Sequence, residues 1–159
     1  MVDKLSSVEL EQCAHALATS ACVNLRKSSR AVTRRFDEAL EPCGLRSTQL
    51  AVLLMIAAME RPTQTRIARE LVAEQSTISR NLQLLKAKGL IKTTAARSSP
   101  YQTISLTPKG VERVREAIPI WERTQNAFVK KFGESRWVES LDSLSNAISS
   151  VHAITLSTD

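Results

Sequence analysis

Residues 75–91 read QSTISRNLQLLKAKGLI, and they decide the fold. Three apolar side chains in this stretch recur at the i, i+4 and i+7 spacing of one buried helical stripe. They are Ile78, Leu82 and Leu85. The pattern predicts a helix from about Ser76 to Lys88, and Gly89 stands where a left-handed C-terminal cap belongs. The face opposite the stripe is polar.

The segments on both sides of this helix predict the rest of a small unit. A short helix is expected from about Gln64 to Leu71, followed by a polar break. After Gly89 the apolar period changes to two, which predicts strands over Leu90–Thr94 and Tyr101–Leu106. The order of helix, polar turn, helix and hairpin is typical of a helix-turn-helix followed by a wing.

The upstream flank is also expected to be helical. One helix is predicted from Val8 to about Leu40, where Pro42 and Gly44 end it. Ser47-Thr48-Gln49 then caps a buried apolar helix over Leu50–Met59.

The downstream flank begins with Thr107 as N-cap and Pro108 at the first helical position. This helix is expected to run towards Phe132, and Pro119 is expected to kink or interrupt it. A last helix opens at Gly133 and carries an apolar stripe. The members of the stripe are Trp137, Leu141, Leu144, Ile148 and Val151.

The first and last helices each present an apolar stripe that the small central unit cannot cover. We therefore expect a homodimer in which two chains cross these helices. The predicted fold class is mainly α with a small two-stranded β wing. Residues 1–45 are expected to form an N-terminal dimerisation helix, 46–107 a winged helix-turn-helix DNA-binding domain, and 108–159 the C-terminal dimerisation helices.

The charge of the chain is concentrated in the predicted winged unit. Of 159 residues, 22 are Lys or Arg and 16 are Asp or Glu, a net charge of +6. Between residues 61 and 97 there are eight basic and two acidic residues, so this segment carries the whole +6 and the remainder balances at fourteen against fourteen. Such a segment indicates a polyanionic partner, although a solvated basic face has the same composition.

The linear order together with the local charge favours duplex DNA as that partner. The polar helix face can enter a major groove about 12 Å wide, and Arg80 can reach a guanine or a phosphate. The expected DNA-binding residues are Gln75, Ser76, Thr77, Ser79, Arg80, Gln83, Lys86, Lys92 and Arg97.

Three strings together resemble the MarR family of winged-helix regulators. They are Gln75–Leu82, Leu85–Ile91 and Ile104–Gly110, and the resemblance extends over about Leu45 to Gly110. It implies an obligate homodimer that binds a near-palindromic operator and is regulated by a small molecule, such as an aromatic acid, or by thiol oxidation. The family's wing usually carries an Asp-x-Arg pattern, whereas residues 95–100 here read AARSSP, so Arg97 would act without the acidic brace.

The three cysteines, Cys13, Cys22 and Cys43, form no Cys-x-x-Cys pair, so we expect free thiols and no metal site. The stretch from Cys22 to Thr33 is similar to the first helix of the organic-peroxide-sensing (OhrR-like) branch, whose reactive cysteine stands at the matching place. The two tyrosines of that branch are replaced by Arg26 and Phe36. Cys22 is therefore either a redox sensor or a buried structural residue.

Other function classes find less support in the sequence. An enzyme is not expected, because the two histidines, His15 and His152, are isolated and no cofactor, metal or nucleophile motif occurs. One Tyr and three Phe are too few for a platform that stacks single-stranded bases. The longest apolar stretch, Leu50–Met59, is too short to cross a bilayer, and no signal peptide is evident, so a cytoplasmic protein is expected.

The expected function is sequence-specific regulation of transcription, as a repressor released by a small molecule or by oxidation of Cys22. The alternative is a non-specific DNA-architectural protein without an effector.

Overall fold

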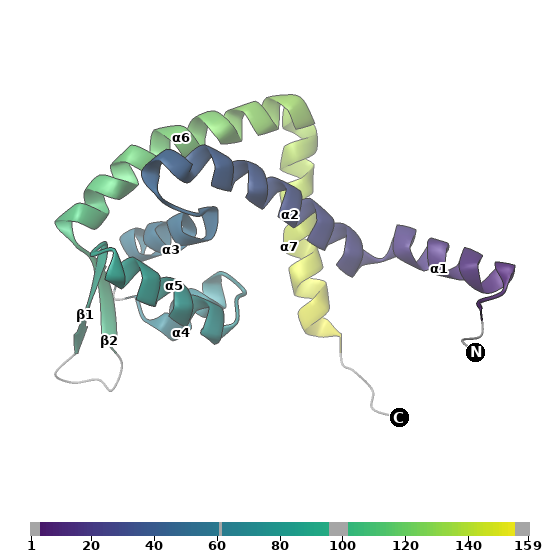
Figure 1. The fold of residues 1–159 in the computed structure, drawn as a ribbon, viewed down its shortest axis with the longest axis horizontal. Helices are drawn as coiled ribbons and strands as arrows, with labels where there is room; N and C mark the ends of the chain where they lie inside the picture. The colour runs from purple at the N-terminus through teal and green to yellow at the C-terminus, as the bar shows by residue number, and fades with distance from the viewer. Residues whose placement is uncertain (1–3, 61, 96–101, 155–159) are drawn as a thin grey trace. The chain divides into compact units, whose positions relative to one another are not determined.

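The computed structural model describes residues 4–60, 62–95 and 102–154, in two compact units that meet between Ala117 and Ile118. As predicted, the described chain is mainly helical with one two-stranded sheet (Figure 1). The elements are α1 (Ser7–Thr19), α2 (Ala21–Leu40), the 3-10 helix η1 (Glu41–Cys43), α3 (Ser47–Ala58), α4 (Gln64–Glu70), α5 (Gln75–Ala87), β1 (Ile91–Ala95), β2 (Gln102–Leu106), α6 (Pro108–Phe132) and α7 (Glu134–Ala153).

The core of the first unit is built around α3, which is apolar on most sides. Its buried side chains pack with the inner faces of α4 and α5, because the apolar positions of those two helices are spaced for a single stripe. The principal core residues are Leu50, Leu53, Ile56, Ile67, Ile78, Leu82, Leu85 and Ile104. The stripe predicted for α5 is thus buried.

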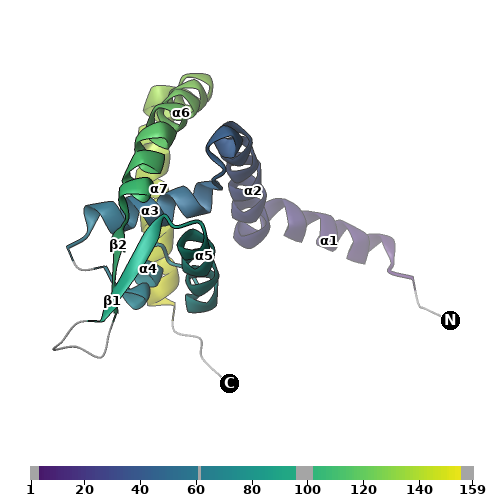
Figure 2. The ribbon, with the colours of Figure 1, turned by 60° about the vertical axis from the view of Figure 1, so that its left-hand side comes forward.

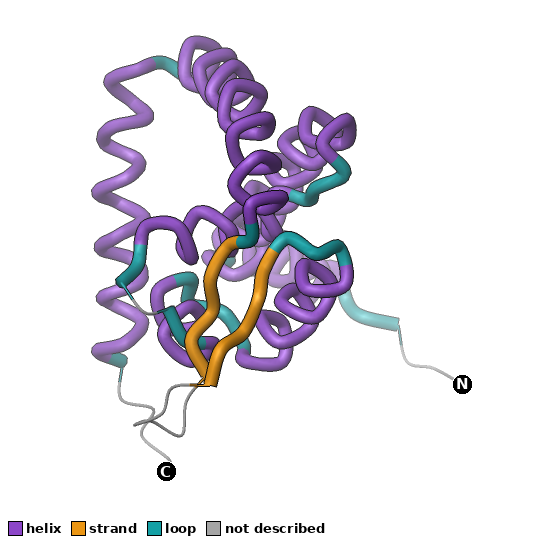
Figure 3. Tube along the Cα trace, turned by 90° about the vertical axis from the view of Figure 1, so that its left-hand side faces the viewer, coloured by secondary structure: helices purple, strands orange, loops and turns teal. Residues whose placement is uncertain are grey.

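The wing is an antiparallel pair in which Ile91 faces Leu106 and Thr93 faces Ile104 (Figure 3). The Ile104 N–H donates to the Pro62 carbonyl at 2.9 Å, which joins the wing to the segment before α4. Gly89 has φ +71°, so the predicted left-handed cap of α5 is confirmed.

The start of α6 packs directly against the end of α5. The Thr107 hydroxyl accepts from the Gly110 N–H at 3.0 Å, so the predicted N-cap is confirmed. A Cβ on Gly110 would overlap the carbonyl oxygen of Leu90 and lie 3.0 Å from its carbonyl carbon. Only glycine therefore allows α6 to lie this close to the backbone at Leu90.

The prediction of a single helix from Val8 to Leu40 is wrong, because Ser20 separates α1 from α2. Ser20 has extended backbone (φ −62°, ψ 115°), and its hydroxyl caps α2 by accepting from the Val23 N–H at 3.3 Å. The Asn24 amide donates to the carbonyls of Ala18 and Ser20, both at 2.9 Å. Short polar side chains can form hydrogen bonds with nearby backbone groups that a continuous helix would otherwise pair. Ser20 and Asn24 form such bonds here, and the chain continues as two separate helices, α1 and α2 (Figure 2).

The predicted cap of α3 is also wrong in its details. Ser47 is the first residue of the helix rather than its cap. Asp37 of α2 caps it instead, accepting from the Ser47 N–H at 2.7 Å and from the Ser47 hydroxyl at 2.8 Å. The capping group comes from ten residues upstream, which local sequence patterns do not reveal.

The second unit holds the end of α6 and all of α7. Pro119 does not interrupt α6, which continues to Phe132. Phe128 stacks on Phe132 with ring centroids 5.6 Å apart, and Trp137 meets Phe128 edge-on at 5.2 Å. These contacts join α6 to α7. Beyond them, the apolar side chains of α7 are exposed.

Candidate nucleic-acid interface

Helix α5 presents a polar face to solvent because its apolar stripe is buried on the other side. The exposed side chains of this face are Gln75, Ser76, Thr77, Arg80, Gln83 and Lys86, and Ser79 is half-buried. Seven of the predicted DNA-binding residues therefore share one helix and one face. Ser76 and Thr77, two of the three small members, lie in the first turn, where a backbone can approach a ligand closely.

The first turn of α5 is held by the preceding helix. The Gln64 side-chain amide donates to the Gln75 carbonyl at 3.3 Å. Between the two helices, Val72 has φ +48°, an uncommon conformation for a β-branched residue. The sharp turn thus places α4 and α5 side by side and brings the start of α4 next to the polar face of α5.

The wing lies along the other edge of α5. Lys86 of α5 donates to the Thr93 hydroxyl of β1 at 3.4 Å, and Lys92 on the same strand is exposed. A groove of about 390 Å³ runs between α4, α5 and the wing. Its polar lining is Thr63, Gln64, Thr65, Ser79, Gln83, Lys86, Thr93 and Gln102. Arg97 lies outside the described residues.

Sequence reasoning missed the contribution of α4 to this surface. Thr63 caps α4 by accepting from the Arg66 N–H at 3.2 Å, and Thr65 lines both the groove and a smaller hollow beside it. Arg66 and Arg69 are exposed, and Arg69 pairs with Glu70 at 3.2 Å. Both arginines belong to the basic segment between residues 61 and 97. The positive charge of that segment was therefore the sequence signal that could have assigned them to this surface.

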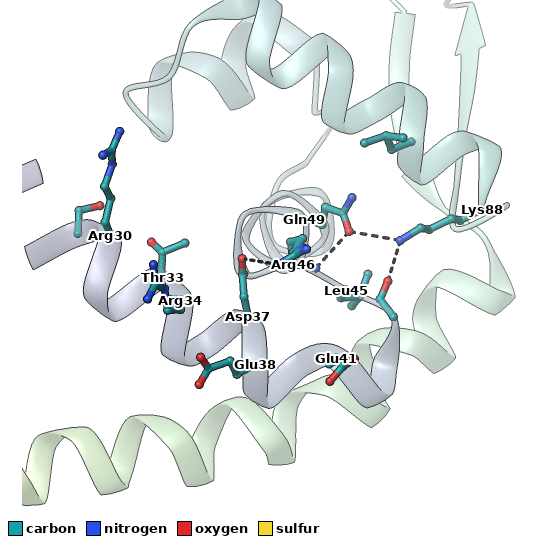
Figure 4. A pocket seen from close by; sticks show the side chains of 13 residues that line it. Arg30, Thr33, Arg34, Asp37, Glu38, Glu41, Leu45, Arg46, Gln49 and Lys88 are labelled. Atoms are coloured by element: carbon teal, nitrogen blue, oxygen red, sulfur yellow. Dashed lines mark hydrogen bonds and ion pairs between the residues drawn. The ribbon is translucent and has the colours of Figure 1, made fainter. Parts of the chain in front are cut away.

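A larger cleft, of about 1000 Å³, lies between α2, the start of α3 and the end of α5 (Figure 4). Seven of its thirteen lining residues are charged and none is aromatic. The charged residues are Arg30, Arg34, Asp37, Glu38, Glu41, Arg46 and Lys88. Leu84 is its exposed apolar residue, whereas Leu45 is buried, so the cleft suits a ligand with a charged group more than a wholly apolar one.

The Asp37 carboxylate lines this cleft and also caps α3 by accepting hydrogen bonds from Ser47. Partial burial raises its pKa, but the hydrogen bonds from the Ser47 N–H and hydroxyl and from Arg46 outweigh that effect. The pKa of the Asp37 carboxyl therefore lies below its usual range. The Arg46 guanidinium is 3.3 Å from the carboxylate.

The described part of the chain holds neither a metal cluster nor a membrane-spanning helix. No group of three or more His, Cys, Asp and Glu side chains gathers there to hold a metal ion. No described helix combines the length and apolar content needed to cross a membrane.

Residues 44–99, which contain α3, α4, α5 and β1, match the family model described as the MarR family. This segment of the chain, about a third of its length, is similar to the MarR family. Proteins of this family are transcriptional regulators, a class that is generally not enzymatic. The predicted resemblance is thereby confirmed.

Solved structures of MarR-family regulators share the arrangement over most of the chain. The transcriptional regulator MosR of M. tuberculosis is 28% identical with a TM-score of 0.78, over 87% of this chain and 100% of MosR. MosR in complex with DNA gives a TM-score of 0.72, also at 28% identity, over 82% of this chain and 97% of MosR. CouR from Rhodococcus jostii RHA1, bound to p-coumaroyl-CoA, shares the fold at 20% identity and a TM-score of 0.70, over 83% of this chain and 94% of CouR.

A relative in Bacillus subtilis (strain 168) is the uncharacterized HTH-type transcriptional regulator YwoH. It is 26% identical over 92 residues, which cover 58% of this chain and 67% of YwoH.

The three cysteines of the chain differ in their exposure. Cys13 and Cys22 are exposed, whereas Cys43, at the end of η1, is buried. The Arg26 guanidinium lies 4.0 Å from the Cys22 sulfur, one helical turn along α2. Cys22 is therefore not a core residue of the chain, and it has a cation beside it.

Proposed function

We propose that this chain is a sequence-specific transcriptional regulator that binds double-stranded DNA as a homodimer and represses transcription. The observation that carries the proposal is the continuous polar face of α5, which stands exposed in the segment that holds the whole net charge of +6. A helix about 10–12 Å across fits a major groove of similar width.

Each part of the surface has a distinct proposed role. Ser76 and Thr77 lie in the first turn of α5, where short side chains let the backbone approach phosphates and base edges. Arg80, one turn further on, suits a bidentate contact with a guanine. Lys86, Lys92 and Arg97 suit phosphates, which position the protein without reading sequence. Gln75, Ser79 and Gln83 complete the proposed contact face.

We propose that the terminal helices form the dimer. Residues 46–107 would then be the DNA-binding domain, and residues 1–45 and 108–159 the dimerisation segments. The exposed apolar side chains of α1 and α7 support this organisation, because a single chain leaves them in water. A two-fold dimer sets two copies of α5 against half-sites about 34 Å apart, so the operator would be near-palindromic. MosR, the 28% identical regulator, has been solved in complex with DNA.

The test begins with selection of bound duplexes from a random pool, followed by fluorescence anisotropy on the selected duplex and on a scrambled one. The wild type should bind the selected duplex far more tightly than the scrambled one. Equal affinity for both would instead favour the non-specific architectural alternative.

Two substitutions then distinguish a residue that contacts DNA bases from one that contacts the phosphate backbone. Arg80→Ala should weaken specific binding by roughly 1–3 kcal/mol if Arg80 reads a base. Lys92→Ala should weaken binding to both duplexes alike and make the salt dependence shallower. Arg123→Ala, an exposed arginine of α6, is the control for loss of one charge and should bind like the wild type. An unchanged affinity and salt slope for Arg80→Ala would remove Arg80 from the interface.

We propose that repression is released at α2, either by a small ligand in the cleft or by oxidation of Cys22. For the first route, Arg30 and Arg34 can meet the carboxylate of an aromatic acid, and Leu84 is the exposed apolar side chain of the same cleft. CouR, which shares the fold, has been solved with p-coumaroyl-CoA. Operator affinity measured with a panel of aromatic carboxylic acids, and separately after mild hydroperoxide, distinguishes the two routes. A regulator that responds to neither treatment would contradict both.

A further inference from the structure

The C-terminal end of α5 is tied to the turn that follows α2. Lys88 is the residue after the last turn of α5, and its Nζ donates to the Gly44 carbonyl at 2.7 Å. The same Nζ lies 3.4 Å from Oε1 of Gln49 near the start of α3 (Figure 4). One ammonium group therefore links the end of α5 to the turn after α2 and the start of α3, about forty residues earlier in the sequence.

The two acceptors of Lys88 are themselves held in place. Gln49 is only 5% exposed, and its Oε1 also accepts from the Arg46 N–H at 3.2 Å. The Gly44 N–H donates to the Glu41 carbonyl at 2.7 Å, which closes the 3-10 turn at the end of α2. Lys88 thus binds to fixed points rather than to mobile side chains.

The start of α6 holds the same end of α5 from another direction. The Lys109 Nζ donates to the Lys88 carbonyl at 2.9 Å, and the Thr107 hydroxyl donates to the Gly89 carbonyl at 2.7 Å. Arg113 donates to the Cys43 carbonyl. These carbonyls lie at helix C-termini, where the helix dipole favours cations. The ends of α2 and α5 are therefore joined to each other and to α6 through cationic side chains.

We propose that Lys88 is a positioning residue for DNA recognition, which sets the direction of α5 relative to α2 and does not itself contact DNA. This inference rests on the proposed DNA-binding function. Lys88 belongs to the basic segment, and charge alone would assign it to DNA. Its ammonium group, however, is engaged with backbone at the end of α5 remote from the polar first turn.

A small change of angle at the C-terminal end of α5 produces a larger displacement at its first turn, because the helix is rigid. Ser76 and Lys88 are twelve residues apart, which is about 18 Å along a helix. A tilt of about 10° at Lys88 would move Ser76 by about 3 Å, the length of a hydrogen bond. The buried stripe of α5 keeps the helix on the core, and the Lys88 tie fixes its angle to α2, one of the helices proposed to join the two protomers.

The experiment compares Lys88→Met, Lys88→Arg and the control Lys4→Met, which removes one exposed charge near the N-terminus, all in the full chain. Affinities are measured by anisotropy for the selected operator, for a duplex with one half-site, and for a scrambled duplex. Lys88→Met should weaken operator binding about tenfold or more, with little change for the half-site and scrambled duplexes. Its salt slope and thermal midpoint should match those of the wild type. Lys88→Arg, which restores a cationic donor, should recover most of the affinity, and Lys4→Met should behave like the wild type.

Hydrogen exchange supplies a readout without DNA. Lys88→Met should accelerate amide exchange both at residues 84–90 and at residues 40–50, and Lys88→Arg should not. Should Lys88→Met lose stability, Lys109→Met tests the same end of α5 from the α6 side and should also impair the operator more than the half-site.

The outcomes separate this proposal from the function on which it rests. If the wild type binds no duplex, the proposed function fails, and the positioning role fails with it. If the wild type binds and Lys88→Met binds equally well, only the positioning role is overturned. Equal weakening on all three duplexes with a shallower salt slope would make Lys88 a phosphate contact and would likewise overturn the proposal.

Discussion

The winged-helix segment and the terminal helices have similar apolar content but opposite burial. Between Phe36 and Ala117 most of the large apolar side chains form one core, in which Leu53 and Ile67 are fully buried. In α1 and α7 no described side chain is buried, and Leu144 and Ile148 of α7 are 42% and 47% exposed. The first region completes its core within one chain, whereas the second leaves apolar side chains exposed, which supports the proposed interface.

This contrast indicates which part of the chain we propose to be covered by a partner. A single helix cannot bury its own stripe, and the contacts of α1 and α7 within the described chain leave their stripes in water. The exposed apolar residues of these two helices are Val8, Leu10, Leu17, Val138, Leu141, Leu144, Ile148 and Val151. A second copy of the chain is the partner that we propose.

The largest effect is expected from a charge in the stripe of α7. Leu144→Asp should bury an unpaired carboxylate in each protomer and cost about 3 kcal/mol or more per site. Sedimentation velocity should then show monomers or aggregates in place of a dimer. Ser145→Asp, which adds the same charge at the next exposed position, is the control and should stay dimeric. If Leu144→Asp remains a folded dimer, the stripe of α7 is not the interface.

A smaller effect is expected from Gly110→Ala, which tests the self-contained region. The added Cβ would overlap the Leu90 carbonyl oxygen, so α6 must shift away from the end of α5. Overpacking of this kind costs about 1–3 kcal/mol. Chemical denaturation should show the loss, while Val111→Ala, at an exposed neighbouring position, should show little change. Equal stability of the two variants would mean that the close approach of α6 to Leu90 is dispensable.

Asp37→Asn tests the junction between the two regions, where α2 caps α3. Because the folded-state pKa of Asp37 is lowered, the ionised carboxylate stabilises the fold at pH values above its unfolded pKa of about 3.9. That contribution should be lost as the pH falls below about 4 and through the folded-state pKa. At pH 7, Asp37→Asn should lower the free energy of unfolding by about 1 kcal/mol.

Urea unfolding at pH 7 and near pH 3 measures this difference. The difference in free energy of unfolding between the wild type and Asp37→Asn should be smaller near pH 3, because protonated Asp37 has lost its charged hydrogen bonds. A gap that stays constant between the two pH values would show that the cap does not depend on the charge of Asp37.

The smallest effect is expected from oxidation of Cys22, which lies on α2 with Arg26 beside it. Oxidation to a sulfenate would add a polar group to a helix of the proposed dimer, and a small shift there would misalign both copies of α5. Operator affinity should fall a few-fold, about 1 kcal/mol, after mild hydroperoxide. Cys13→Ser, at the other exposed thiol, should keep the response, and Cys22→Ser should lose it. An equal response of Cys22→Ser and the wild type would leave Cys22 without a sensing role.

Local patterns were sufficient for the buried face of α5 and for the ends of several elements. The spacing of Ile78, Leu82 and Leu85 predicted the buried face of α5, and Gly89 and Thr107 predicted where elements end and begin. The exposed residues predicted for DNA followed from the same periodicity, because a helix with one buried stripe must turn its other face to water. Their contact with DNA stays a prediction.

Long-range contacts could not be predicted in this way. Asp37 caps a helix that begins ten residues later, and Lys88 reaches Gly44 and Gln49 across about forty residues of sequence. The Ser20 break depends on a choice between continued helix and a local serine cap, which the helical periodicity of 8–40 concealed.

The sequence by itself therefore determined the order of elements, the face of each helix that is buried and the place of the basic surface, since periodicity and charge are properties of short segments. Only the tertiary structure decided that Asp37 rather than Ser47 caps α3, that α4 contributes to the basic surface, and that Lys88 ties α5 to the end of α2. These outcomes depend on distances between segments remote in sequence, which exist only once the apolar core has brought the segments together.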